Sequence, residues 1–258
     1  MKILEVHNLV KTFKDPNNNN FKVLDDITLS LNKGEVLGLV GESGSGKTTL
    51  GRTIIRLTNQ DSGNIIFDNI DISNLSKSVM KKIRKDMQII FQDPFGSLNP
   101  RHSIEHIIAE PLLVHKYGTY DEIKKRVLQL LDQVGLPKDS MKLYPHEFSG
   151  GQRQRIAIAR AIALKPKFLI ADEAVSALDV SIQSQILNLI SDLVKEYNIS
   201  MVFISHDLSV IRHISSNIAI MKKGKIVEMG NTEKVLKHPS NEYTQMLITA
   251  VPGFQSNF

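Results

Sequence analysis

Apolar residues along the chain fall into short strand-like runs and longer stretches with helical spacing. Residues 3–9 and 23–31 alternate between apolar and polar positions, which is typical of strands with one buried face. Residues 36–40 and 168–171 are apolar throughout, as strands covered on both faces of a sheet are. Because strand runs alternate with helical patterns over much of the chain, the pattern predicts an α/β fold with a largely parallel sheet.

The middle of the chain, from about residue 103 to residue 143, has helical spacing and no strand pattern. Thr119 and Glu122 have the spacing of a capping box at a helix start. Gly135 marks the expected end of that helix. We therefore expect a helical subdomain inserted into the α/β domain.

Further elements are expected on both sides of this helical stretch. The four asparagines at 17–20 are expected in a surface loop between the first two strands. Lys223 and Gly224 separate two strand runs that would form a hairpin. A short helical tail is expected after it. Helices are predicted at about 47–57, 151–164 and 182–193, and strands at 201–204, 218–221 and 225–228.

The composition is that of a globular protein, because 41% of the 258 residues are hydrophobic and 23% are charged. The net charge of +5 would suit nucleotide phosphates, nucleic acid or an anionic membrane surface, but it is spread along the chain without a dense basic block. The sequence contains no cysteine, which excludes disulfides and cysteine-ligated zinc or iron–sulfur sites and fits the cytosol.

No segment has the pattern of a secretion signal or a membrane span. Residues 1–6 lack a long apolar core and a cleavage site, so we expect no secretion signal. Apolar runs such as 36–40 are far shorter than the roughly 20 residues that a spanning helix needs. Any role at a membrane is therefore expected to depend on a partner.

A glycine-rich turn follows the strand predicted at 36–40 and precedes a predicted helix. It matches the pattern GxxxxGK[ST], in which backbone N–H groups and the positive end of a helix bind phosphates. Lys47 would reach the β- and γ-phosphates of a nucleotide, and the Thr48 hydroxyl would bind Mg²⁺. The alternative is a glycine turn with a solvent-facing lysine. The phosphate-binding residues expected here are Gly41, Glu42, Ser43, Gly44, Ser45, Gly46, Lys47, Thr48 and Thr49.

Two carboxylates, Asp172 and Glu173, end the apolar run at 168–171. Asp172 could hold Mg²⁺, and Glu173 could polarise the water that attacks the γ-phosphate. The alternative is a solvated strand end or a helix cap.

A second anion-binding helix start is predicted at residues 149–152, which we call the signature. It consists of Ser149, Gly150, Gly151 and Gln152. A serine and glycines at a helix start can bind an anion through backbone N–H groups. By the sequence alone, the ordinary interpretation is a serine N-cap.

The order of these motifs resembles that of the ABC transporter ATPases over nearly the whole chain. The resemblance rests on the phosphate loop, Gln92, the signature, Asp172 with Glu173, residues 176–179 and His206. Finer motifs at 92–94, 97–100, 144–147, 238–239 and 243–245 resemble the oligopeptide, dipeptide and nickel importer branch. Ala174 and Val175 depart from the proline and threonine of many relatives, which puts in doubt the local stiffness after the strand.

The resemblance implies a P-loop NTPase core with a largely parallel sheet, an N-terminal antiparallel β-subdomain and an inserted helical subdomain. All of these would belong to a single domain of residues 1–258. The expected division assigns about 1–90 and 165–235 to the nucleotide-binding core, about 91–164 to the helical subdomain and about 236–258 to a short C-terminal tail.

The resemblance also implies that ATP and Mg²⁺ are bound, with two ATP molecules held between two subunits arranged head to tail. The signature of one subunit would contact the ATP held by the other. Gln92 would sense Mg²⁺ and the attacking water, His206 would contact the γ-phosphate, and Asp179 would communicate across the dimer. Without the resemblance, Gln92 is an ordinary surface residue, His206 a satisfied polar residue and Asp179 a helix cap.

The family pattern points to Phe13 as the aromatic residue that stacks on adenine. An aromatic face can hold a base without reading its edge. Phe21, across the asparagine loop, is the competitor, and either residue could instead belong to the core.

The adjacent residues Ser205, His206 and Asp207 superficially suggest a hydrolase triad. Neighbouring residues at a strand end project in different directions, so they cannot form the required relay. We therefore reject this hypothesis.

The predicted function is an ATP-hydrolysing subunit at the cytoplasmic face of the membrane, which powers import of peptides or of nickel and related metal complexes. Expected partners are two transmembrane permease subunits, a second identical or related ATPase subunit and, indirectly, an extracellular binding protein, with no nucleic acid. The alternative is a soluble ABC ATPase of translation or DNA repair, which the basic charge slightly favours. A non-catalytic nucleotide-binding regulator would be expected to lack Glu173, His206 or the signature, and all are present.

Overall fold

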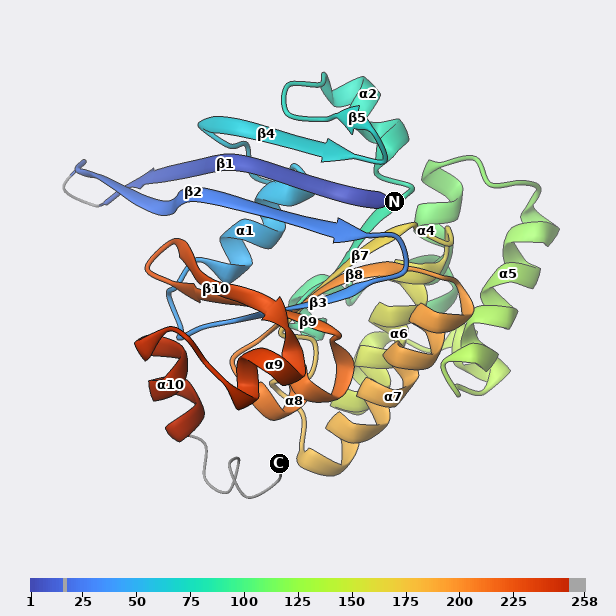
Figure 1. Ribbon diagram of the computed structural model, residues 1–258. Helices are drawn as coiled ribbons and strands as arrows, with labels where there is room; N and C mark the ends of the chain where they lie inside the picture. The colour runs from blue at the N-terminus through green and yellow to red at the C-terminus, as the bar shows by residue number, and fades with distance from the viewer. Residues whose placement is uncertain (16–17, 251–258) are drawn as a thin grey trace. The chain divides into compact units, whose positions relative to one another are not determined.

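The structure is a computed structural model that describes residues 1–15 and 18–250 (Figure 1). Contacts between Cα atoms divide it into two compact units, which are described separately below. The first contains Met1–Lys77 and the chain from Ser200 onward, and the second contains Ser78–Ile199.

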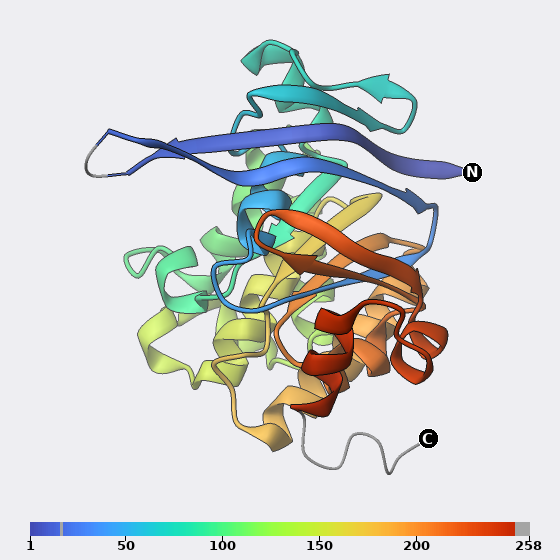
Figure 2. The ribbon, with the colours of Figure 1, turned by 60° about the vertical axis from the view of Figure 1, so that its left-hand side comes forward.

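The first unit holds an antiparallel sheet with the strand order β2-β1-β4-β5. Figures 1 and 2 show β1, β2 and β4 running side by side. The predicted antiparallel β-subdomain is therefore confirmed. The strands are β1 (Lys2–Lys14), β2 (Asn20–Asn32), β4 (Ser62–Phe67) and β5 (Ile70–Asp71).

Strand β1 is longer than the predicted residues 3–9. Asn8 has a positive φ of 48°, and the register with β2 shifts between Val6 and Leu9. Such a bulge adds one residue and interrupts the period of two on which the prediction rests. Of the four asparagines expected in the following loop, Asn20 begins β2, and Asn17 lies outside the described residues.

The first unit also contains β3, the strand that leads into the phosphate loop, and strands that pair with it. Strand β3 pairs in parallel with both β8 and β9, and β10 pairs antiparallel with β9 in the predicted hairpin. The strands are β3 (Val36–Val40), β8 (Ser200–Ser205), β9 (Asn217–Lys222) and β10 (Lys225–Asn231). The helices are α1 (Lys47–Ile54), α8 (Leu208–Ile214), α9 (Thr232–Lys237) and α10 (Glu242–Thr249).

The predicted helix at 47–57 ends earlier, at Ile54. Arg56 has a positive φ of 57°, which no right-handed helix accommodates. Its guanidinium donates to the carbonyls of Ile72 and Ser73, so a tertiary contact stabilises this turn. A local apolar pattern does not contain that information.

The second unit is largely helical, and its strands β6 (Met87–Ile90) and β7 (Phe168–Asp172) pair in parallel. Between residues 103 and 143 the chain forms helices and no strand, as the helical pattern predicts. The Thr119–Glu122 capping box is also confirmed. The helices are α2 (Lys77–Ile83), α3 (Pro94–Ser97), α4 (Ile104–Val114), α5 (Tyr120–Gln133), η1 (Lys138–Lys142), η2 (Pro145–Glu147), α6 (Gly150–Ile162) and α7 (Val180–Glu196).

Both units bury the apolar runs that the pattern predicts as covered strands. Phe168 in β7 and Phe203 in β8 have no exposed surface, and every residue of these two strands is buried. The parallel strands and the flanking helices confirm the predicted α/β class. None of the described helices is long and apolar enough to cross a membrane.

Candidate functional site

The glycine-rich turn lies between β3 and α1, as the phosphate-loop pattern requires. Gly46 is the N-cap of α1 and has a φ of 104°, a conformation that favours glycine. At Gly41 a Cβ atom would lie 2.1 Å from the carbonyl oxygen of Met221, so only glycine allows this close packing. Helix α1 has no side-chain cap and no acidic residue in its first turn. Its N-terminal backbone N–H groups can therefore serve an anion.

Backbone carbonyl groups of the phosphate loop hold the side chain of Lys47. Its side chain is only 5% exposed, and its Nζ atom donates to the carbonyl oxygens of Gly41, at 2.7 Å, and Glu42, at 2.8 Å. Carbonyl contacts stabilise the charged ammonium in this partly desolvated position. The alternative of a solvent-facing lysine is therefore wrong.

Asp172 and Glu173 lie at the end of β7, in the second unit. Asp172 is the last residue of the strand and is 2% exposed. Glu173 follows with a positive φ of 47°, and its carbonyl oxygen accepts from the backbone N–H and the hydroxyl of Ser176. Left-handed conformations of non-glycine residues are uncommon and gather at functional sites.

The structure brings Gln92 and Glu173 together, although 81 residues separate them. Gln92 follows β6 by two residues, and its Nε2 atom donates to Glu173 Oε2 at 3.0 Å. The parallel pairing of β6 with β7 places the carboxyl ends of both strands at the same edge. The amide thus fixes the orientation of the carboxylate that we expect to act on water.

The signature forms the exposed start of α6. Ser149 is the N-cap, and its Oγ accepts from the backbone N–H of Gln152 at 3.4 Å. The Gln152 side chain accepts from the backbone N–H of Ser149 at 2.9 Å, which completes a capping box. The N-cap interpretation therefore holds within this chain. It leaves an exposed helix start without acidic residues, which is suited to an anion brought by another molecule.

Asp179 is the N-cap of α7. Its carboxylate accepts from the backbone N–H of Ile182 at 2.9 Å and from the hydroxyl of Ser181 at 2.8 Å. These hydrogen bonds, that of Ile182 above all, hold the pKa of the Asp179 carboxyl below its ordinary value. The carboxylate is therefore ionised at neutral pH.

His206 follows β8 directly and is exposed. The neighbouring hydroxyl of Ser205 accepts from the backbone N–H of Asp207, while the Asp207 carboxylate accepts from the N–H of Ser209 and caps α8. The side chains of Ser205 and Asp207 thus stabilise the turn between β8 and α8. The geometry agrees with the rejection of a hydrolase triad.

Phe13 and Phe21 are cross-strand partners in β1 and β2, with ring centroids 6.5 Å apart. They are 39% and 49% exposed, so neither belongs to the core. The ammonium of Lys11 lies 5.4 Å from the Phe13 ring centroid. The choice between the two rings as the adenine platform stays open.

The donors proposed for Mg²⁺ are the Thr48 hydroxyl, the Gln92 amide and the Asp172 carboxylate. Among the described residues, no group of three or more His, Cys, Asp and Glu side chains could hold a metal. Mg²⁺ is commonly bound by one or two carboxylates together with substrate phosphates and water. The chemical types of these donors therefore agree with those that bind a magnesium ion together with a nucleotide, and the magnesium site stays a prediction.

Sequence reasoning missed two arginines of α6 that hold the segment after Gln92. The guanidinium of Arg153 lies 3.6 Å from the ring centroid of Phe95 in α3, and that of Arg160 donates to the carbonyl oxygen of Ser97. Arg153 also donates to the carbonyls of Pro145, at 2.6 Å, and His146, at 3.3 Å. The seven-residue spacing puts both arginines on one helix face, which was the available signal. We call Arg153 and Arg160 the arginine clamp.

Comparisons with known proteins agree with this set of elements. The family model described as "ABC transporter" matches residues 24–176. The oligopeptide transport ATP-binding protein OppF of Streptococcus mutans serotype c is 51% identical, with 97% of this chain and 82% of that protein covered. The dipeptide transport ATP-binding protein DppF of Lactococcus lactis is 47% identical, with 98% and 82% covered.

Solved structures give the same result. The dimeric structure of the ATP-binding cassette MJ0796 bound to ADP and Pi is 30% identical with a TM-score of 0.81, and 89% of this chain and 98% of that chain are covered. The structure of cbiO1 from Clostridium perfringens, part of the ABC transporter complex cbiONQ, is 29% identical with a TM-score of 0.81, covering 100% and 99%. The family model covers more than half of the chain, and the two curated relatives are similar over most of their length. This chain therefore belongs to the ABC transporter family.

Proposed function

We propose that the chain is the ATP-binding and ATP-hydrolysing subunit of a membrane importer for oligopeptides or dipeptides. The observation that carries the hydrolytic part is the hydrogen bond between Gln92 and Glu173, in a chain that also has a complete phosphate loop. Support for the peptide cargo comes from the names of OppF and DppF, both of which are peptide transport proteins.

The phosphate loop binds the β- and γ-phosphates through the N-terminal N–H groups of α1 and the ammonium of Lys47. Because carbonyls of the loop already hold Lys47, little side-chain freedom remains to be lost when ATP binds. Thr48, Gln92 and Asp172 are the residues that would hold Mg²⁺. When bound, the ion neutralises the charge that develops on the phosphates.

Glu173 acts as the general base that polarises the attacking water. The Gln92 amide donates to Glu173 and aims the carboxylate. We expect Gln92 also to sense the attacking water and His206 to contact the γ-phosphate. A positioned base contributes about 10²- to 10⁴-fold to such a reaction.

A second subunit completes each site. We propose that the exposed start of α6 contacts the γ-phosphate of ATP held by the partner subunit, and that Asp179 lies close to the dimer interface. Ser149 caps its own helix, and its hydroxyl accepts from the backbone N–H of Gln152. The first turn of α6, which includes Gly150 and Gly151, contains no acidic residue. The geometry thus supports an anion-binding role in addition to capping.

Two permease subunits are the expected membrane partners, served by an extracellular binding protein. Phe95 follows Gln92 by three residues and is 63% exposed, although it is a large aromatic side chain. Exposed aromatic residues often serve as interface anchors. We propose that Phe95 contacts a permease subunit at the cytoplasmic face of the membrane.

The alternative of a soluble ATPase of translation or DNA repair receives no support from these relatives, which are named as transport proteins. Their names likewise mention peptides and not nickel. A direct test is the full complex in proteoliposomes, assembled from this chain, two candidate permease subunits and a peptide-binding protein. We expect its ATPase activity to rise with a peptide-loaded binding protein and not with nickel. Stimulation by nickel alone would contradict the peptide assignment.

The hydrolytic assignment is tested in the isolated chain by Lys47→Ala and Glu173→Gln. We expect Lys47→Ala to weaken ATP binding by about 10- to 100-fold, since a charge-assisted hydrogen bond is lost. We expect Glu173→Gln to keep ATP binding and to lose about 10²- to 10⁴-fold in phosphate release. Nucleotide titration and phosphate release measure both.

The matched control is Glu196→Gln, because Glu196 is exposed and its carboxylate accepts a hydrogen bond from the Nε2 atom of Gln133. It should hydrolyse ATP like the unchanged chain. Normal hydrolysis by Glu173→Gln would refute the role of Glu173 as base.

A further inference from the structure

Helix α10 contacts the phosphate loop through the side chain of Tyr243. The backbone N–H of Glu42 donates to the Tyr243 hydroxyl at 3.2 Å, although 201 residues separate them. The tyrosine is 4% exposed, and burial raises the pKa of its hydroxyl, which stays protonated at neutral pH. We propose that Tyr243 is a positioning residue for ATP binding, which acts through the first peptide group of the phosphate loop. This inference rests on the proposed function.

The peptide group between Gly41 and Glu42 is held at both of its polar atoms. Its carbonyl oxygen, on Gly41, accepts from Lys47 Nζ at 2.7 Å. Its N–H, on Glu42, donates to Tyr243. Because a peptide group is planar and rigid, a rotation that breaks the tyrosine contact also moves the acceptor of the lysine. Tyr243 therefore helps to fix the ammonium that is expected to meet the phosphates.

Tyr243 is itself held in place from several sides. Asn241 caps α10 by accepting from the backbone N–H of Tyr243 at 2.9 Å. Glu228 of β10 accepts from the backbone N–H groups of Ser240, at 2.8 Å, and Asn241, at 3.2 Å. These contacts tie the start of α10 to the sheet that carries the phosphate loop.

The ring of Tyr243 has a further contact with β9. Lys222 Nζ lies 4.3 Å from the ring centroid, within the range of a cation–π interaction. The preceding residue, Met221, packs its carbonyl against Gly41. Strand β9 and helix α10 thus support the same end of the phosphate loop, and the hydroxyl of Tyr243 is aimed at one N–H group.

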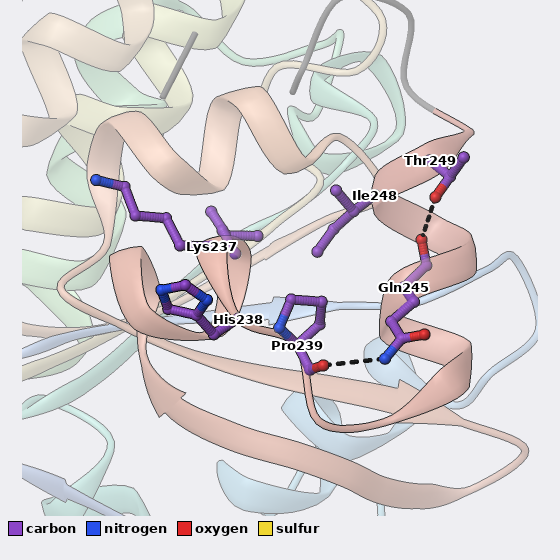
Figure 3. A pocket seen from close by; sticks show the side chains of 7 residues that line it. Lys237, His238, Pro239, Gln245, Ile248 and Thr249 are labelled. Atoms are coloured by element: carbon purple, nitrogen blue, oxygen red, sulfur yellow. Dashed lines mark hydrogen bonds between the residues drawn. The ribbon is translucent and has the colours of Figure 1, made fainter. Parts of the chain in front are cut away.

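Another part of α10 provides a matched control. Gln245, Ile248 and Thr249 of this helix line a pocket together with Lys237, His238 and Pro239 (Figure 3), and the pocket has a volume of about 580 Å³. Gln245 donates from Nε2 to the carbonyl oxygen of Pro239 at 3.1 Å. Gln245→Ala therefore loosens the start of α10 without removing the hydroxyl that contacts the phosphate loop.

The test compares Tyr243→Phe, which removes one oxygen atom and keeps the ring, with Gln245→Ala. For Tyr243→Phe we expect the Kd of ATP and of ADP and the KM for ATP to rise about fivefold, as for loss of one hydrogen bond. We expect kcat to stay within about twofold, because the hydroxyl acts on binding and not on the water. Gln245→Ala should keep the original Kd and KM.

A double-mutant cycle identifies the route of the effect. In the Lys47→Ala background, Tyr243→Phe should change the Kd of ATP by less than about twofold, because its effect passes through the lysine. A full fivefold change in that background would contradict the route. Unchanged Kd values for Tyr243→Phe alone, or equal losses in Tyr243→Phe and Gln245→Ala, would overturn the inference. If the unchanged chain does not bind ATP, it is the proposed function that fails.

Discussion

Ser149 shows how one side chain can have a structural role in its own chain and a proposed role toward a partner. Its hydroxyl caps α6, and Gln152 returns a hydrogen bond to its backbone. Replacing a serine N-cap by alanine costs about 1 kcal/mol of stability. A functional test at this residue must therefore separate the loss of the cap from an obstruction of the partner's phosphate.

We predict that Ser149→Arg keeps ATP binding to the isolated chain and suppresses hydrolysis. The reason is that a bulky cation obstructs the partner's ATP and leaves the chain's own phosphate loop unchanged. Ser149→Ala serves as the control, since it loses the cap without adding bulk. ATP titration and phosphate release would measure both variants. A large loss of ATP affinity in Ser149→Arg would place the residue at the chain's own site and contradict the prediction.

The roles of single residues could be predicted from the sequence where the motif itself is local. The phosphate loop and the helix caps at Thr119 and Ser149 depend on neighbours within a few positions, and the structure contains each of them. The contacts of Gln92 with Glu173 and of Tyr243 with Glu42 join residues far apart in the chain. No local pattern encodes such pairs, so only the folded backbone brings them into view.

At the scale of elements, the arginine clamp connects the signature helix α6 with α3, which follows the proposed catalytic Gln92. Arg153 is 8% exposed, and its guanidinium lies between two backbone carbonyls of η2 and the ring of Phe95. Removing the arginine would leave carbonyl acceptors without their donor, which costs about 1–3 kcal/mol. The clamp therefore couples the position of α3 to that of α6.

We predict that Arg153→Gln lowers ATP hydrolysis about tenfold and keeps ATP affinity within about twofold, because it displaces Gln92 and leaves the phosphate loop intact. Phe95→Tyr should retain activity, since it preserves the aromatic face, and Phe95→Leu should lose part of it. Phosphate release and denaturant unfolding measure these effects. Arg155→Gln is the matched control, because Arg155 on the same helix donates to Val134. Equal losses in Arg153→Gln and Arg155→Gln would argue against a specific link to α3.

Element types were easier to predict than their ends. Continuous apolar runs predicted β3 and β7, because a covered strand needs apolar residues on both faces. The bulge at Asn8 and the turn at Arg56 each depend on a positive φ that the apolar pattern does not register. The short elements β5 and α3 bury few apolar residues, so they give almost no periodic signal.

At the scale of the whole molecule, the residues that we propose for ATP binding and hydrolysis belong to two compact units. The first unit contains the phosphate loop and His206, and the second contains Gln92, Asp172, Glu173 and the signature. The division expected at about 91–164 and 236–258 stays a prediction. Because the signature is proposed to serve a partner, a single chain would be incomplete as an ATPase. Activity is therefore expected to depend on assembly.

The last prediction concerns this assembly. We expect the purified chain to be mainly monomeric and weakly active, and to dimerise when ATP is bound and not hydrolysed. Each site leaves phosphate charge unmatched until the partner's α6 start arrives, so ATP favours the dimer and hydrolysis releases it. A related cassette, MJ0796, forms a dimer with bound ADP and Pi.

Glu173→Gln with Mg·ATP should shift to dimer in light-scattering or size-exclusion measurements, whereas ADP should leave the isolated chain monomeric. Lys47→Ala with the same nucleotide is the control, since it should not retain enough ATP to dimerise. A dimer independent of nucleotide would contradict a mechanism in which ATP drives closure, because closure would then need no phosphate. If ATP produces a dimer only after a related ATPase subunit is added, the native assembly is a heterodimer. In that case the signature of this chain serves the sibling's ATP, and Ser149→Arg should block hydrolysis at the sibling's phosphate loop.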